Sequence, residues 1–202
     1  MKGFLIIIIV ATSFILSSAY SFEILALGTS NTNCRAGGHA FTAAIEMRLV
    51  ANGINATVLN AGVDGDKPVF MLTRLESLLK TNPNIKLVIF EPGPNEKRKN
   101  INVETLEKVL AYLQSIKMPT IYASSDYAHT RAEGQAAADK FGAYYYGPWY
   151  QGVPRDKEHY TFDNVNNSTN NFSGHMNAGG CKLWGEKMAP FAQKVIEEKN
   201  LR

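Results

Sequence analysis

The sequence has little excess charge of either sign. Its 21 Lys and Arg residues nearly balance its 18 Asp and Glu residues, giving a formal net charge of +3 at pH 7. The two kinds of charge are interspersed along the chain, and no basic stripe of the kind that binds nucleic acid is present. We therefore expect neither nucleic acid nor another strongly charged macromolecule as a partner.

Residues that bind metals are also scarce. His39, His129 and His159 have no partner at metal-ligand spacing, and the sequence contains no zinc signature, so no metal site is predicted. The only cysteines are Cys34 and Cys181. In an oxidising compartment such a pair favours a disulfide, whereas two separate buried thiols would act as small apolar side chains. Sequence alone gives no Cα separation, so both interpretations stay open at this point.

The apolar run near the N-terminus is too short to span a membrane. The apolar run at 4–16 contains no charge, but a spanning helix needs about 18–20 apolar residues. Lys2 precedes this run, and small residues follow it at Ser17, Ser18, Ala19 and Ser21. This order predicts a secretory signal peptide over residues 1–21, cleaved after Ala19 or Ser21, rather than a retained anchor. The mature protein would then be one domain, residues 22–202, that is secreted or periplasmic and has no stable membrane anchor.

The rest of the chain has the composition and patterning of an α/β domain. Hydrophobic residues make up 45% of the sequence and charged residues 19%. The predicted strands cover 22–27, 56–59, 86–91, 120–123 and 143–146, and the predicted helices cover 38–52, 68–80, 102–117, 129–141 and 178–199. Repeated strand–helix units predict a parallel sheet of about five strands with helices on both faces.

Polar clusters follow three of the predicted strands, at residues 28–30, 60–62 and 93–95, and His175 lies just before the last helix. In an open α/β sheet, ligands bind beyond the carboxyl ends of the strands. The clusters supply a hydroxyl, a glycine amide, a side-chain amide and an imidazole. Acyl transfer needs this set, because it uses a nucleophile, donors for the developing oxyanion and a base.

Taken singly, each of these residues has an ordinary structural explanation. Ser30 could cap a helix, Asn95 could belong to a turn, and Gly62 could serve only for a positive φ angle. His175 could be an exposed residue before a helix. Their order and spacing, rather than any one of them, point to a catalytic function.

Four segments together resemble the SGNH (GDSL-like) hydrolase family, whose sequence blocks supply Ser, Gly, Asn and His in that order. The segments are residues 24–32, 58–66, 91–96 and 174–180, so the resemblance spans nearly all of the chain after the signal peptide. It implies a three-layer α/β/α, flavodoxin-like fold and a hydrolase that needs no metal or organic cofactor.

The resemblance also implies a role for each residue. Ser30 would be the nucleophile and His175 the general base. The oxyanion hole would consist of the Ser30 amide, the Gly62 amide and the Asn95 side chain. A neutral imidazole suits the removal of the serine proton near neutral pH.

Two positions depart from the family pattern. The family has Asp immediately before the serine and Asp three residues before the histidine, where this chain has Thr29 and Phe172. The third member of a triad fixes the imidazole tautomer and stabilises the imidazolium. We therefore expect a Ser–His dyad with some assistance. The candidates for orienting the His175 ring are Asn171, Ser173, Asp163 and a backbone carbonyl.

The resemblance also bears on the two cysteines. Cys34 lies four residues after Ser30, and Cys181 lies six residues after His175. If the two blocks converge on one site, these cysteines lie at the same end of the sheet. A disulfide there would hold the nucleophile segment against the base segment, so we predict one.

The predicted function is an exported serine esterase or lipase-like hydrolase that forms an acyl-serine intermediate. Its substrate would be a small-molecule, glycan or lipid ester, such as a short acyl ester, a lysophospholipid, a thioester or an acetylated extracellular glycan. The missing Asp residues motivate an alternative, a catalytically silent protein that binds glycans or lipids. A further alternative is an acyltransferase that uses the same serine.

Overall fold

The computed structural model describes residues 22–35, 37–161 and 174–201. The predicted signal peptide, the 162–173 segment and three candidate partners of His175 (Asp163, Asn171 and Ser173) lie outside the described residues. The strands are β1 (Phe22–Gly28), β2 (Ala56–Gly62), β3 (Ile85–Phe90), β4 (Thr120–Ser124) and β5 (Tyr144–Pro148). The helices are α1 (Ser30–Asn33), α2 (Ala40–Ala51), α3 (Pro68–Thr81), α4 (Lys99–Ser115), α5 (Arg131–Phe141) and α6 (Ala178–Glu198).

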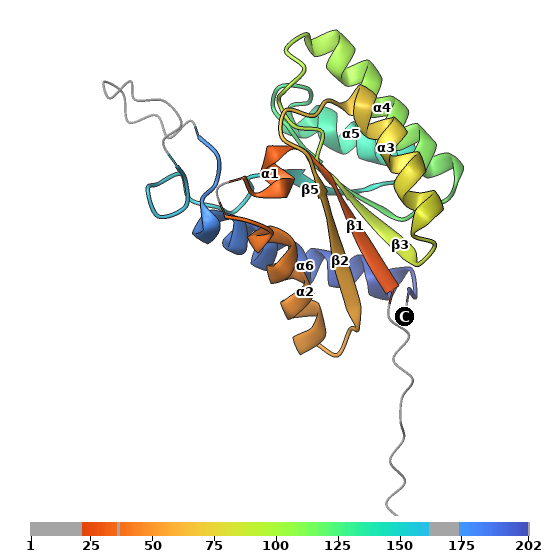
Figure 1. Ribbon diagram of the computed structural model, residues 1–202. Helices are drawn as coiled ribbons and strands as arrows, with labels where there is room; N and C mark the ends of the chain where they lie inside the picture. The colour runs from red at the N-terminus through yellow and green to blue at the C-terminus, as the bar shows by residue number, and fades with distance from the viewer. Residues whose placement is uncertain (1–21, 36, 162–173, 202) are drawn as a thin grey trace, which may run out of the picture.

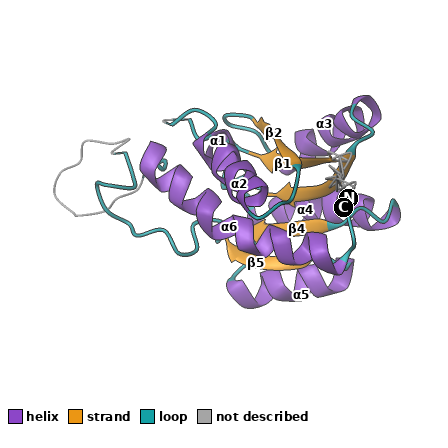
Figure 2. Ribbon diagram, turned by 90° about the horizontal axis from the view of Figure 1, so that it is seen from below, coloured by secondary structure: helices purple, strands orange, loops and turns teal. Residues whose placement is uncertain are grey.

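The five strands form one parallel sheet in the order β2-β1-β3-β4-β5. Helices α2 and α6 cover one face, and α3, α4 and α5 cover the other (Figures 1 and 2). The predicted three-layer α/β fold is confirmed. Among the described residues, no helix is long and apolar enough to cross a membrane.

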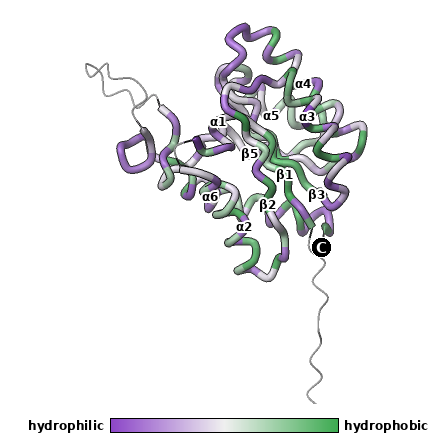
Figure 3. The backbone as a smooth tube through the Cα atoms, viewed as in Figure 1, coloured by the Kyte–Doolittle hydropathy of each residue, from purple (hydrophilic) through white to green (hydrophobic). Residues whose placement is uncertain are grey.

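Strand β1 lies between β2 and β3, and both of its faces are buried. Ile24 and Ala26 face the core under α2 and α6, whereas Leu25 and Leu27 face the core under α3 and α4. A strand buried on both faces reads as a continuous apolar run, which is the pattern that predicted it. Figure 3 shows this hydrophobic colour concentrated along the strands.

The structure corrects the sequence prediction around the end of β2. The prediction ended that strand at Leu59, but it continues through Gly62, which pairs with Gly28 of β1. The short helix α1, which the prediction omitted, packs directly over this end. A Cβ atom at Gly62 would lie 2.1 Å from the backbone nitrogen of Asn33. Glycine is therefore required here by the close approach of α1 rather than by a positive φ angle.

A disulfide joins Cys34 to Cys181, with their Cα atoms 6.0 Å apart. Cys34 caps the C-terminus of α1, and Cys181 lies in the first turn of α6. The bridge therefore ties the segment after Ser30 to the helix that begins just after His175. This confirms the predicted pairing and joins residues 147 positions apart.

We expect the double variant Cys34→Ala/Cys181→Ala to lose about 2–5 kcal/mol of unfolding free energy, because the bridge closes a long loop in the unfolded chain. Urea denaturation measures this difference. Reductant should destabilise the unmodified protein to a similar degree and leave the double variant unchanged. Equal stability of the oxidised protein and the variant would contradict a structural role for the bridge.

Candidate active site

Ser30 lies in the tight turn between β1 and α1. Thr29 is the N-cap of α1, and its side-chain oxygen accepts a hydrogen bond from the Asn31 backbone N–H. Ser30 is the first residue of the helix and is 7% exposed. The N–H groups of the first helical turn have no intrahelical acceptor, so the Ser30 amide is available to a ligand at this edge. The turn thus offers a hydroxyl and a backbone donor from one residue.

His175 is brought to Ser30 from the other end of the chain. Its Nε2 lies 2.8 Å from the Ser30 Oγ, although 145 positions separate the two residues. The carbonyl of His175 accepts hydrogen bonds from the Thr161 amide at 2.8 Å and the Thr161 hydroxyl at 3.0 Å. Asn177 then caps α6 by accepting from the Gly180 amide. The backbone of His175 is therefore fixed by Thr161 at its carbonyl and by the capped start of α6 that follows it. With the proton on Nδ1, the Ser30 hydroxyl donates to Nε2, which is the arrangement of a nucleophile and its base.

Gly62 lies beside residues 29–32, here called the nucleophile turn because it carries the predicted nucleophile Ser30. The Gly62 amide already has an acceptor. The Gly62 N–H donates to Asn60 Oδ1 at 3.0 Å, and Asn60 Nδ2 donates to the Thr32 carbonyl at 3.0 Å. Asn60 thus links the end of β2 to α1. The structure does not present the Gly62 N–H to a ligand, because β2 continues through this residue and the Asn60 side chain folds back onto it.

Asn95 lies on the loop after β3. Its Nδ2 donates to the Asp66 carbonyl at 2.9 Å. A side-chain amide nitrogen carries two hydrogens, and this bond uses one of them. The second hydrogen can serve a ligand, while the first fixes the orientation of the amide.

An ion pair behind this loop holds the ends of two strands together. Arg74 of α3 donates to Asp66 through Nη2 at 2.6 Å and Nε at 3.1 Å. The same guanidinium donates to the Ala61 carbonyl at 2.8 Å and the Gly28 carbonyl at 3.4 Å. Arg74 therefore fixes the ends of β1 and β2, and Asp66 in turn anchors Asn95. The sequence prediction missed both residues, although Asp66 lies within the second block of the resemblance.

Glu91 is the other residue that the prediction left without a role. It follows β3 directly, is fully buried, and accepts hydrogen bonds from three residues of the nucleophile turn: Thr29, Asn31 and Thr32. Burial raises the pKa of Glu91 above its ordinary value, and the hydrogen bonds from the turn oppose that rise. In the sequence, Glu91 is marked only by its position after the apolar run at 87–90 and at the start of the third segment of the resemblance.

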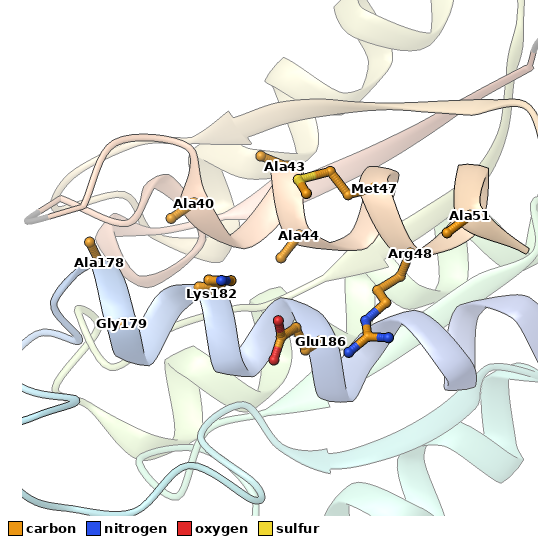
Figure 4. A pocket seen from close by; sticks show the side chains of 10 residues that line it. All are labelled: Ala40, Ala43, Ala44, Met47, Arg48, Ala51, Ala178, Gly179, Lys182 and Glu186. Atoms are coloured by element: carbon orange, nitrogen blue, oxygen red, sulfur yellow. The ribbon is translucent and has the colours of Figure 1, made fainter.

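A largely apolar groove lies elsewhere, between α2 and α6 (Figure 4). Its volume is about 610 Å³, and alanines of α2 and the first turn of α6 line much of it. None of the four residues expected to act in catalysis lines this groove. Within the part of the chain that the structure describes, no group of three or more His, Cys, Asp or Glu side chains could hold a metal ion.

Solved structures with the same arrangement are esterases and related hydrolases. TesA superposes with a TM-score of 0.71 at 17% identity, over 86% of this chain and 99% of TesA. The SGNH-hydrolase family esterase AlinE4 gives a TM-score of 0.64 at 22% identity, over 89% of this chain and 96% of AlinE4. This is the fold of the SGNH hydrolases.

A third example of the SGNH fold is the psychrotrophic esterase EstA from Pseudoalteromonas sp., in a structure inhibited by monoethylphosphonate. It superposes with a TM-score of 0.69 at 15% identity, over 87% of this chain and 98% of EstA. The sequence itself matches no family model and no curated protein. At these identities the similarity establishes the fold alone.

We expect Arg74→Met to destabilise the protein by about 1.5–3 kcal/mol, because the substitution leaves the nearly buried Asp66 carboxylate without its cation. Activity should fall as well, since Asp66 anchors Asn95. Chemical denaturation measures the first effect. Lys108→Met is a matched control that breaks the exposed Lys108–Glu104 pair, and it should leave stability nearly unchanged. Equal effects of the two substitutions would contradict a special role for Arg74.

Proposed function

We propose that this protein is a serine esterase that hydrolyses carboxylic esters through an acyl-serine intermediate. The observation that carries the proposal is the 2.8 Å contact between Ser30 Oγ and His175 Nε2 at the carboxyl edge of a sheet with the SGNH fold. If Ser30 only capped a helix and His175 were only an exposed loop residue, their side chains would not need to be in contact, since 145 positions separate them in the sequence. The contact therefore supports catalysis over the purely structural explanation of each residue.

In the proposed mechanism, His175 Nε2 takes the proton of Ser30 as Oγ attacks the ester carbonyl. The carbonyl oxygen becomes an oxyanion that accepts from the Ser30 amide and the Asn95 Nδ2. Collapse of the tetrahedral intermediate expels the alcohol, which takes the proton back from His175. Water then attacks the acyl-serine with His175 again as base, and the carboxylic acid leaves.

The proposed oxyanion hole has two donors in this arrangement. Gly62, expected as a third, can join it only if the Asn60 side chain releases the Gly62 amide. Two preorganised donors suffice for a large effect, because removal of one typically costs about 100- to 1,000-fold in rate.

Carboxylic esters are the substrate class that the comparisons support. The structural neighbours include a lipase/acylhydrolase from Enterococcus faecalis and the acetyl xylan esterase AlAXEase, besides the esterases named above. We propose small-molecule or glycan- and lipid-borne esters as substrates here. The Ser30–His175 contact favours this activity over a silent binding protein, which would not need a base at the hydroxyl.

We also propose that the enzyme is exported after its signal peptide is cleaved off following Ala19 or Ser21. The Cys34–Cys181 disulfide supports this, because disulfides persist in oxidising compartments and are rare in the cytosol.

Ser30→Ala should abolish hydrolysis of p-nitrophenyl acetate and butyrate, with a loss of about 1,000-fold or more, because the nucleophile is gone. It should also abolish covalent labelling by a fluorophosphonate, the probe class suggested by the phosphonate-inhibited neighbour. Ser77→Ala, at an exposed serine of α3, is the matched control and should keep both properties. Turnover that survives in Ser30→Ala would refute Ser30 as the nucleophile. An unmodified protein that neither turns over nor is labelled would favour the binding function.

Asn95→Ala should lower kcat by about 100- to 1,000-fold and change KM little, because the lost donor acts mainly on the oxyanion of the transition state. Steady-state kinetics with p-nitrophenyl acetate test this expectation. Thermal unfolding of the same variant shows whether the fold is retained. A rise in KM with unchanged kcat would place Asn95 in substrate binding instead.

A further inference from the structure

Glu91 directs both of its carboxylate oxygens at the nucleophile turn. Oε2 accepts from the Thr29 amide at 3.0 Å, the Thr29 hydroxyl at 2.8 Å and the Thr32 hydroxyl at 3.1 Å. Oε1 accepts from Asn31 Nδ2 at 3.3 Å. The donors belong to the residue before Ser30 and to the two residues after it. One carboxylate therefore contacts the turn on both sides of the nucleophile.

The carboxylate is itself rigidly placed. The Glu91 amide donates to the Leu27 carbonyl at 2.9 Å, which ties the end of β3 to the end of β1. The next turn closes over Thr29, which is fully buried, and a Cβ at Gly93 would lie 2.1 Å from Thr29 Cγ2. Glu91 thus fixes the position of the nucleophile turn relative to strands β1 and β3.

A buried carboxylate at this position is costly for stability. Among the described residues, no Lys, Arg or His lies within 4.0 Å of the Glu91 carboxylate to pair with it. Transfer of a charge from water to the interior is unfavourable unless hydrogen bonds or a counter-ion offset it. Here the hydrogen bonds from the turn are the only offset. An apolar side chain in the same space would leave the Thr29 amide and the Thr29 and Thr32 hydroxyls without their acceptor, so the carboxylate serves to hold the turn rather than to fill space.

We propose that Glu91 is a positioning residue for Ser30. Its carboxylate fixes the 29–32 turn so that Ser30 Oγ meets His175 Nε2 and the Ser30 amide faces the substrate. The inference rests on the proposed esterase function. The contact also explains Thr29. The family that this chain resembles has Asp just before its serine, whereas here Glu91, directly after β3, places a carboxylate against the Thr29 hydroxyl.

The hydrogen-bond directions show why a carboxylate is suited to this task. Both threonine hydroxyls can donate to an acceptor that has no hydrogen of its own, and Thr29 Oγ1 keeps a lone pair for the Asn31 amide. A glutamine at position 91 has one oxygen and one NH₂ group. If its oxygen replaced Oε2, its NH₂ group would meet Asn31 Nδ2, and the Asn31 amide would have to turn over. The turn would keep its shape only in part.

The test compares Glu91→Gln with Glu76→Gln, which changes an exposed glutamate of α3. We expect Glu91→Gln to lower kcat for p-nitrophenyl acetate and the rate of fluorophosphonate labelling by about 10- to 100-fold, because small displacements of reacting atoms cost that much. KM should change less than about threefold, since the substrate pocket is not altered. Glu76→Gln should match the unmodified protein in all three quantities.

A coupling measurement separates positioning from general stability. Thr32→Val alone should lower kcat by about 3- to 10-fold, because three of the four hydrogen bonds to Glu91 remain. The same substitution made in Glu91→Gln should have a smaller effect, since the two residues act through one contact. If Glu91→Gln does not fold, the kcat of Thr32→Val carries the test.

The outcomes are distinct. An active unmodified protein whose kcat and labelling rate survive in Glu91→Gln would overturn the role of Glu91 and leave the esterase proposal intact. Unchanged kcat in Thr32→Val would do the same. An unmodified protein with neither turnover nor labelling would overturn the esterase proposal and the positioning role together.

Discussion

The parallel pairing of β1 with β2 and β3 is the constraint on which the candidate site depends. In the observed register, Gly28 lies beside Gly62 and Leu27 lies beside Phe90. The chain leaves all three strands at one edge of the sheet, so the segments that follow them meet there. The pairing is strongly specified because β1 is buried on both faces, and a shift of one residue would turn each of its side chains into the opposite core.

The base reaches this edge by a different route. His175 follows no strand; it precedes α6, which packs on α2 through the stacked rings of Phe41 and Trp184, whose centroids are 3.7 Å apart. The disulfide from Cys34 fixes the first turn of the same helix. Packing of α6 on α2 and the disulfide thus position His175, the proposed base, as strand pairing positions Ser30, the proposed nucleophile. The Thr161 contacts add support from the preceding loop.

The site also shows where the fold tolerates unfavourable burial. Glu91 and the Asp66–Arg74 pair hold this edge together through contacts with the ends of β1 and β2, with helix α1 and with the loop that carries Asn95. Buried carboxylates are seldom the most stable choice for a core position. Their concentration around Ser30 and Asn95 is consistent with selection for precise geometry at one edge, while the two apolar cores supply the stability.

The sequence by itself determined the succession of strands and helices and the parallel α/β class, because continuous apolar runs and helical periods are local patterns. It also identified Ser30 and His175 as candidates through the order of four blocks, and it paired Cys34 with Cys181. Only the tertiary structure decided the contacts of Glu91, the hydrogen bond from the Gly62 amide to Asn60, and the contacts of Arg74 with Asp66 and the strand ends. The Glu91 contact with Thr29 spans 62 positions and the Arg74 contact with Gly28 spans 46, so local patterns in the sequence do not reveal them. The Asn60–Gly62 bond is local, but the Asn60 side chain is also held by the Thr32 carbonyl of α1, a contact that only the tertiary structure makes.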